Sequence, residues 1–243
     1  MSPATPDPAA AARALHSPDR SSIAFLFDLD GTLVDSVYLH VLAWREALEA
    51  AGVGLAVWRI HRRIGMSGGL FINALLREIG HPVSPESVER MQKLHAEAYN
   101  KLARQLRPLP GARELLTALT NQGVPWAIAT SGKTDSAAPA LRALGVADTA
   151  TVVTRDQVRY AKPDPDLFLA AAARLEFPIE NTVVVGDSVW DLLAARRARA
   201  LGIGLLSGGY GEDELARAGA YRVYEDPADL LAHLDEVGVR PAE

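Results

Sequence analysis

The sequence predicts an α/β protein, with a doubly wound, Rossmann-like parallel sheet as its core and an all-helical domain inserted into it. From residue 21 onward, short β-branched or aromatic runs alternate with segments of helical length. This alternation is typical of a parallel sheet covered by helices on both faces. Between residues 36 and 106 the strand signal disappears and only helical periodicity remains.

Six apolar runs are expected to form the strands of this sheet. They span residues 23–27, 125–129, 151–153, 182–185, 203–206 and 221–224. Two of the intervening helices have clear starts in the sequence. Asp164-Pro165 and Asp226-Pro227 each match an N-cap residue followed by proline at the first helical position.

The inserted segment is expected to be helical throughout. Val41, Trp44 and Leu48 fit one apolar stripe at helical spacing, and residues 88–106 carry a second, longer stripe. The prolines and glycine of RPLPG, residues 107–111, then end the last helix of the insert. The predicted organisation is a loose tail (1–20), a catalytic α/β core (21–35 and 107–243) and a helical cap domain (36–106).

Composition narrows the range of partners. The 243-residue chain has a formal net charge of -5, so it has no basic surplus for a nucleic-acid backbone or an anionic membrane. It has no cysteine, which excludes disulfides, thiolate zinc sites and thiol nucleophiles. Residues 1–20 hold no apolar stretch long enough for a signal peptide or a membrane span. We therefore expect a cytoplasmic protein with a small-molecule partner, and composition leaves open whether it is a monomer or a dimer.

Polar side chains follow several predicted strands at the point where each strand ends. In open parallel sheets, ligands bind beyond the carboxyl ends of the strands. The loops are therefore expected to converge on one pocket. The candidate residues are Asp28 and Asp30 after the first strand, Thr130, Ser131 and Gly132 after the second, Lys162 in YAKPDPD, and Asp187 with Asp191 after TVVVG.

Four motifs in this order carry a family resemblance. They are DLDGT (28–32), IATSG around Thr130, AKPDP around Lys162, and GDSVWD (186–191). Together they resemble the haloacid dehalogenase superfamily phosphatases whose helical cap is of the phosphoglycolate phosphatase and β-phosphoglucomutase type. The resemblance covers residues 23 to about 234. It implies a Mg²⁺-dependent phosphatase that acts on a small phosphate ester through an aspartyl-phosphate.

The resemblance implies three catalytic roles. Asp28 would attack phosphorus, because a carboxylate that is ionised at neutral pH needs no separate base. Asp30 would protonate the leaving alcohol and then deprotonate water, so it must hold a proton at neutral pH. A neighbouring anion and partial burial are expected to raise the pKa of Asp30 above its reference value. Lys162 would bridge the nucleophile and the phosphoryl group.

The resemblance also implies a metal site and a phosphate-binding loop. Mg²⁺ suits an all-oxygen site, and its protein ligands would be the carboxylates of Asp28 and Asp187 with the backbone carbonyl of Asp30. Asp191 would bind a metal-bound water or orient its loop. The implied phosphoryl-binding residues are Thr130, Ser131 and Gly132.

Other members of the superfamily fit the sequence less well. Dehalogenases and phosphonatases of this fold lack an aspartate at the position of Asp30. β-Phosphoglucomutases resemble the chain in cap type, but they carry an acidic residue where this chain has Gly186 and a more polar stretch where it has RRIGMSGG, residues 62–69. A protein that only binds a ligand would have no need to keep the four side chains that carry the chemistry, which are Asp28, Asp30, Lys162 and Asp187. A phosphomutase and a non-catalytic protein that binds a phosphorylated ligand remain the alternatives to a phosphatase.

The cap segment is expected to set specificity by closing over the pocket. Its glycines allow close backbone approach. Arg59, Arg62 or Arg63 would then meet an anionic group of the substrate such as a carboxylate, while ordinary exposed arginines are the alternative. The candidate cap positions are Arg62, Arg63, Gly65 and Ser67.

Overall fold

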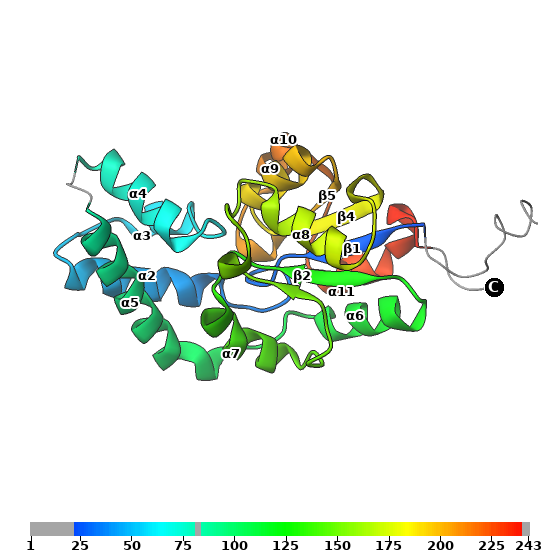
Figure 1. Cartoon of the computed structure of the whole chain (residues 1–243), viewed down its shortest axis with the longest axis horizontal. Helices are drawn as coiled ribbons and strands as arrows, with labels where there is room; N and C mark the ends of the chain where they lie inside the picture. The colour runs from blue at the N-terminus through cyan, green and yellow to red at the C-terminus, as the bar shows by residue number, and fades with distance from the viewer. Residues whose placement is uncertain (1–21, 81–83, 240–243) are drawn as a thin grey trace, which may run out of the picture.

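The computed structural model describes residues 22–80 and 84–239, so the predicted tail lies outside the described residues. Within them, one sheet of six parallel strands has the order β3-β2-β1-β4-β5-β6 (Figure 1). The fold class predicted from sequence is confirmed. The strands are β1 (Ala24–Phe27), β2 (Trp126–Ala129), β3 (Val152–Val153), β4 (Thr182–Gly186), β5 (Leu201–Leu205) and β6 (Ala220–Tyr224).

All six predicted runs form strands, with ends that differ by one or two residues. The largest difference is at β5, which begins at Leu201 rather than at residue 203. Leu201 and Gly202 pair with Val183 and Val184 of β4. Strand pairing is set by the neighbouring strand, and a glycine gives no strand signal in the sequence.

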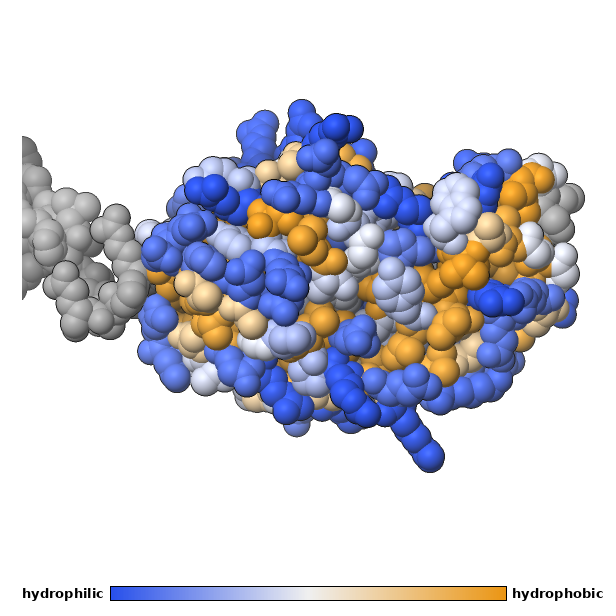
Figure 2. Space-filling view, turned by 180° about the vertical axis from the view of Figure 1, so that it is seen from behind, coloured by the Kyte–Doolittle hydropathy of each residue, from blue (hydrophilic) through white to orange (hydrophobic). Residues whose placement is uncertain are grey.

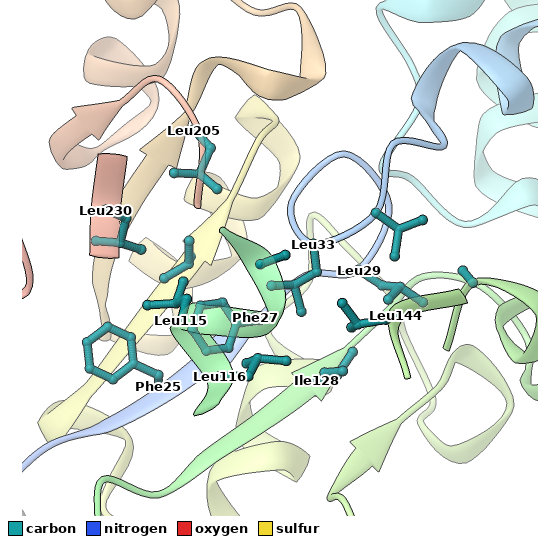
Figure 3. Close-up of a cluster of buried hydrophobic side chains, with 14 of the residues drawn as sticks. Phe25, Phe27, Leu29, Leu33, Leu115, Leu116, Ile128, Leu144, Leu205 and Leu230 are labelled. Carbon is teal, nitrogen blue, oxygen red and sulfur yellow. The ribbon is translucent and has the colours of Figure 1, made fainter. Parts of the chain in front are cut away.

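Successive side chains of the strands face opposite layers of helices. Phe25 and Phe27 belong to the core on one face, and Leu26 belongs to the core on the other. Figure 3 shows the first of these cores. Helices α6 (Ala112–Asn121), α7 (Thr134–Leu144) and α11 (Pro227–Ala232) cover that face, α8 (Asp166–Arg174) and α9 (Val189–Ala198) cover the opposite one, and α10 (Glu212–Ala218) packs against α9.

One of the two predicted helix starts is confirmed and the other is wrong by one residue. Asp226 caps α11 by accepting hydrogen bonds from the backbone N–H groups of Ala228 and Asp229. Helix α8 begins at Asp166, not at Pro165. The N–H of Asp164 donates to the carbonyl of Ala161 at 3.1 Å, so the chain is still in a turn at the expected cap.

Between β1 and β2 the structure places the helical insert. Its helices are α2 (Val37–Ala50), α3 (Val57–His61), α4 (Gly68–Glu78) and α5 (Pro85–Leu102). Trp44, Leu48, Phe71 and Leu75 belong to a buried core that lies within the insert and is separate from the two cores on the sheet. The insert extends beyond the carboxyl end of the sheet in Figure 1. On the face seen in Figure 2, apolar side chains are exposed over the insert as well as over the core.

The strand order fixes where a ligand site is expected. The chain proceeds from β1 through β2 to β3 in one direction and from β4 through β5 to β6 in the other. The topological switch point therefore lies between β1 and β4, and ligand sites of doubly wound sheets lie at the carboxyl ends of such strands. None of the described helices has the length and apolar character needed to cross a membrane.

Candidate active site

Three aspartates and one lysine meet at the switch point, all of them buried. Asp28 directly follows β1, Asp187 directly follows β4, and Asp191 lies in the first turn of α9. Carboxylate oxygens of the three lie within 4.8 Å of one another. The Nζ atom of Lys162, from the loop before α8, lies 2.5 Å from Asp28 Oδ1 and 2.8 Å from Asp191 Oδ1. Four residues selected from the sequence are therefore adjacent in the structure.

The DLDGT turn is shaped around Asp187. Gly31 has a φ of +84°, a left-handed conformation that favours glycine, and a Cβ there would lie 2.5 Å from Asp187 Oδ2. The hydroxyl of Thr32 donates to Asp187 Oδ1 at 2.8 Å. The glycine and the threonine of the motif thus bring the end of β1 against the aspartate that follows β4.

Asp191 holds the lysine rather than facing the cavity. Its Oδ1 accepts from Lys162, and its Oδ2 accepts from both the backbone N–H and the hydroxyl of Ser188, at 3.1 and 2.5 Å. Both oxygens are therefore occupied. The sequence left two roles open for Asp191, binding a metal-bound water or orienting its loop. These hydrogen bonds support the second role.

The electrostatics of the cluster favour an additional cation. Burial raises the pKa of Asp28 to about 7, against the opposing effect of Lys162 and with the help of Asp191. Burial, together with Asp191 and Asp28, also raises the pKa of Asp187. Burial alone would lower the pKa of Lys162, but Asp191 and Asp28 raise it. One lysine therefore does not offset three buried carboxylates, and a site of carboxylate oxygens suits a hard divalent cation.

Asp30 turns away from this cluster. Its Oδ1 accepts a hydrogen bond from the Ser36 hydroxyl at 2.6 Å and lies 3.2 Å from His40 Nε2. Burial would raise the pKa of Asp30, but His40 and Ser36 lower it overall. The expectation that the pKa of Asp30 is raised is therefore wrong, because His40 and the Ser36 hydroxyl outweigh the effect of burial. No role was expected for His40 from the sequence, although it lies four residues after Ser36 and hence on the same side of the first helical turns.

The loop after β2 carries the hydroxyls expected to bind a phosphoryl group. Thr130 Oγ1 accepts from the N–H of Gly132 at 3.0 Å, which closes a tight turn. The Ser131 hydroxyl is buried and has no hydrogen-bond partner among the described residues. Like Asp28 and Asp30, the residues of this loop line the cavity; they are Thr130, Ser131 and Gly132.

Comparison with known proteins decides the family. The sequence model of the haloacid dehalogenase-like hydrolases matches residues 24–199. The chain belongs to this family. A hydrolase from Pseudomonas syringae, known from its crystal structure, is 56% identical, with a TM-score of 0.87 over 89% of this chain and 99% of that one.

Two curated relatives of this haloacid dehalogenase-like hydrolase have named activities. Hexitol phosphatase A of Escherichia coli is 34% identical over 175 residues, which are 72% of this chain and 78% of that protein. β-Phosphoglucomutase of Bacillus subtilis is 29% identical over 87% of this chain and 92% of that protein. The resemblance found in the motifs is thereby confirmed.

The cavity of the hydrolase lies between the sheet and the insert. Its volume is about 960 Å³, and its lining includes Asp28 and Thr130 from the core with Trp44, Asn73 and Gln92 from the insert. The phosphoryl group of a substrate would lie at the core end. The leaving group would then contact the insert, where the sequence placed specificity.

The cap arginines of this haloacid dehalogenase-like hydrolase are paired within the protein. Arg62 donates to Glu214 and lies over the ring of Tyr210 at 4.3 Å. Arg63 lines the cavity, but its guanidinium pairs with Glu78. Neither guanidinium is thus a free cation in this arrangement. The expected contact of an arginine with an anionic substrate group stays a prediction. The sequence missed these pairings because their carboxylates come from other elements.

Two other predicted cap positions do line the cavity. Gly65 has a φ of +97°, and a Cβ there would lie 2.7 Å from the hydroxyl of Ser188. The predicted close approach of the cap backbone to the core is therefore present at this glycine. Ser67 is buried at the start of α4 and borders the same space.

Proposed function

We propose that the protein is a Mg²⁺-dependent phosphomonoesterase that hydrolyses a small phosphorylated metabolite through an aspartyl-phosphate. The observation that carries the proposal is the buried contact of Lys162 with Asp28 beside Asp187, at the switch point of the sheet. Relatives named phosphoglycolate phosphatase and N-acetylmuramic acid 6-phosphate phosphatase favour phosphoglycolate or a sugar phosphate as the substrate type. The cytoplasm remains our predicted location.

In the first step, a carboxylate oxygen of Asp28 attacks phosphorus while the bond to the leaving oxygen breaks. Lys162 lies against that carboxylate and offsets negative charge on the phosphoryl group. The hydroxyls of Thr130 and Ser131 can donate to phosphoryl oxygens, since both border the cavity. Asp191 keeps Lys162 in place through its own hydrogen bond.

Asp30 handles the protons of both steps. Its Oδ1 is held by Ser36 and His40, while Oδ2 has no hydrogen-bond partner among the described residues. Oδ2 would give its proton to the leaving alkoxide and then accept one from the attacking water. A bound phosphate dianion adds negative charge beside Asp30, which favours the protonated form that the first step needs. The second attack releases inorganic phosphate and restores Asp28.

A magnesium ion fits the donor set at this position. Asp28 and Asp187 would hold it with their carboxylates and Asp30 with its backbone carbonyl, all hard oxygen donors. At 4 Å and an effective dielectric of about 20, each pair of like charges costs about 4 kcal/mol. The ion would offset this repulsion when a phosphate dianion enters and would polarise the phosphoryl group.

A phosphomutase is the second candidate, favoured by the likeness to β-phosphoglucomutase. Those enzymes carry an acidic residue at the position of Gly186. Here a Cβ on Gly186 would lie 2.3 Å from Asp191 Cβ, so no side chain fits without a rearrangement of the residue that holds Lys162. This packing supports hydrolysis over phosphoryl return to a sugar.

The proposal is tested by phosphate release from a panel of esters, with and without Mg²⁺. The panel contains 2-phosphoglycolate, hexose and hexitol phosphates, mononucleotides and 4-nitrophenyl phosphate. We expect Mg²⁺-dependent release that Asp28→Asn abolishes, while the matched variant Asp35→Asn, at an exposed aspartate of the same segment, retains it. Substantial release by Asp28→Asn would overturn the nucleophile assignment. Isomerisation of a sugar phosphate that needs a sugar bisphosphate and gives no net phosphate release would favour the mutase.

A further inference from the structure

A line of three side chains runs from Asp30 into the insert. His40 lies near the start of α2, with Nε2 3.2 Å from Asp30 Oδ1. Its other ring nitrogen, Nδ1, lies 3.1 Å from Nε2 of His95, which belongs to α5. Two helices of the insert therefore meet through a histidine pair that ends on the carboxylate assigned above as acid and base.

Aromatic rings hold both imidazoles in place. His40 stacks on Tyr99 with ring centroids 4.0 Å apart and planes 5° apart. His95 stacks on Trp44 at 4.0 Å and 17°. The stacking holds the plane of each ring, so each imidazole makes its hydrogen bonds through the nitrogens at its edge. His95 lies in the segment 88–106, for which the sequence predicts an apolar helical stripe, and its polar contact with His40 lies between α2 and α5.

The histidine pair determines where His40 carries its hydrogen. Burial and the neighbouring His40 hold the pKa of His95 well below its usual range, so His95 is neutral. When His95 Nε2–H donates to His40 Nδ1, the hydrogen of a neutral His40 is on Nε2 and points at Asp30. A protonated His40 also points its Nε2–H at Asp30. The remaining tautomer would set the lone pair of His40 Nε2 against the ionised carboxylate, which is repulsive.

We infer that His95 is a positioning residue: through its hydrogen bond to His40, it keeps Asp30 Oδ1 anchored and leaves Oδ2 directed to the leaving group. The inference rests on the proposed function, because it uses Asp30 as the acid. It makes α5, an element of the insert, part of the apparatus that transfers the proton. Substrate need not contact His95 for this effect.

Two substitutions separate the hydrogen bond of His95 from its packing. His95→Phe keeps a ring to stack on Trp44 but loses Nε2. His95→Gln loses the ring but keeps an N–H donor that can reach His40. If His95 acts through its hydrogen bond, Gln preserves function better than Phe, whereas a packing role predicts the reverse order.

The measurement is kcat/KM for esters with different leaving groups, because this parameter covers the step in which the leaving group departs. An alkyl ester needs a proton from Asp30, whereas 4-nitrophenolate leaves readily without one. We expect His95→Phe to lower kcat/KM by about 10-fold or more for the best alkyl ester of the panel and by under about 3-fold for 4-nitrophenyl phosphate. His95→Gln should recover most of the loss, and the alkyl effect should appear in kcat. Thermal melting monitors folding of each variant.

Each other outcome overturns a defined part of the argument. Equal losses on both esters, with no recovery in His95→Gln, would assign His95 to packing. A change confined to KM would make it a substrate contact, since it borders the cavity. If Asp30→Asn lowered kcat/KM equally for the alkyl ester and for 4-nitrophenyl phosphate, Asp30 would not be the acid. If the unmodified protein released no phosphate, the proposed function would fail. If those controls behave as expected and His95→Phe has no effect, only the His95 inference fails.

Discussion

The phosphoryl end of the cavity holds buried charged side chains that bind one another, whereas the insert end holds paired side chains such as Arg63 together with polar side chains that have no partner. Asp28, Asp187 and Lys162 are at most 3% exposed. At the insert end, Gln92 and Lys93 line the cavity and make no hydrogen bond or ion pair with another described residue. The sheet therefore fixes the groups that we propose act on phosphorus, and the insert presents polar groups that remain available to a leaving group.

This difference separates catalysis from substrate choice. A phosphoryl group is common to every ester that the protein can hydrolyse, so changes at the core end should lower the rates for all esters together. The leaving group differs between esters, so changes at the insert end should alter their ranking. The histidine pair is the exception that we propose, because it connects the insert to the proton transfer itself.

The largest effect is expected when the buried lysine loses its charge. Lys162→Met leaves Asp28 and Asp191 without their cation, and we expect kcat to fall by about 10²–10³-fold on every ester. The free energy of unfolding should fall by about 3–5 kcal/mol, as when one partner of a buried ion pair is removed. Urea unfolding and steady-state rates measure the two effects.

Two variants control this experiment. Lys162→Arg keeps the charge and should remain better folded than Lys162→Met, while Lys133→Met removes an exposed lysine at the same cavity and should cost little. A loss that differs strongly from ester to ester in Lys162→Met would contradict the separation of the two ends.

Metal binding should stabilise the phosphoryl end by a smaller amount. At a Mg²⁺ concentration of 100 times Kd, the free energy of unfolding rises by about 2.7 kcal/mol. We expect a corresponding rise in Tm when MgCl₂ is added to protein treated with a chelator. Asp187→Asn should abolish the rise, and Asp35→Asn should preserve it. An unchanged rise in Asp187→Asn would place the ion elsewhere.

The core end was the more predictable from sequence. Short apolar runs such as TVVVG indicate buried parallel strands, and polar residues at their carboxyl ends converge in any sheet of this topology. Asp28, Lys162 and Asp187 could therefore be brought together without coordinates. The glycine of the DLDGT motif is visible in the sequence. Its close approach to Asp187 Oδ2 could not be predicted, because it depends on how closely the two loops pack.

The insert end depends on contacts that spacing does not reveal. The register between α2 and α5 pairs His40 with His95, 55 residues apart in sequence. Arg62 pairs with Glu214, 152 residues away. The lowered pKa of Asp30 follows from His40 and Ser36, so even the electrostatics of a motif residue required the packed helix.

The paired arginines give a small expected effect that sharpens the comparison. Arg62→Met and Arg63→Met should change kcat/KM by less than about 3-fold and leave the ranking of phosphoglycolate and neutral sugar phosphates unchanged. Each pair is partly exposed, so the loss of stability should be about 1 kcal/mol or less. Gln92→Ala, at an unpaired position of the insert, should change the ranking more. If either arginine variant selectively lost phosphoglycolate, the arginine would bind the carboxylate of that ester.

The smallest effect concerns a carboxylate at the cavity rim that contrasts with Asp28. Asp156 is exposed, and hydrogen bonds from Thr154 and Thr134 lower its pKa to about 2, whereas burial raises that of Asp28 to about 7. A pKa below the unfolded value of 3.8 means that the folded state binds the proton less tightly. The stabilisation is therefore complete above about pH 4 and is lost as the pH falls towards about 2. We expect Asp156→Asn to flatten this part of the stability profile in urea unfolding; an unchanged slope would mean that other carboxylates produce it.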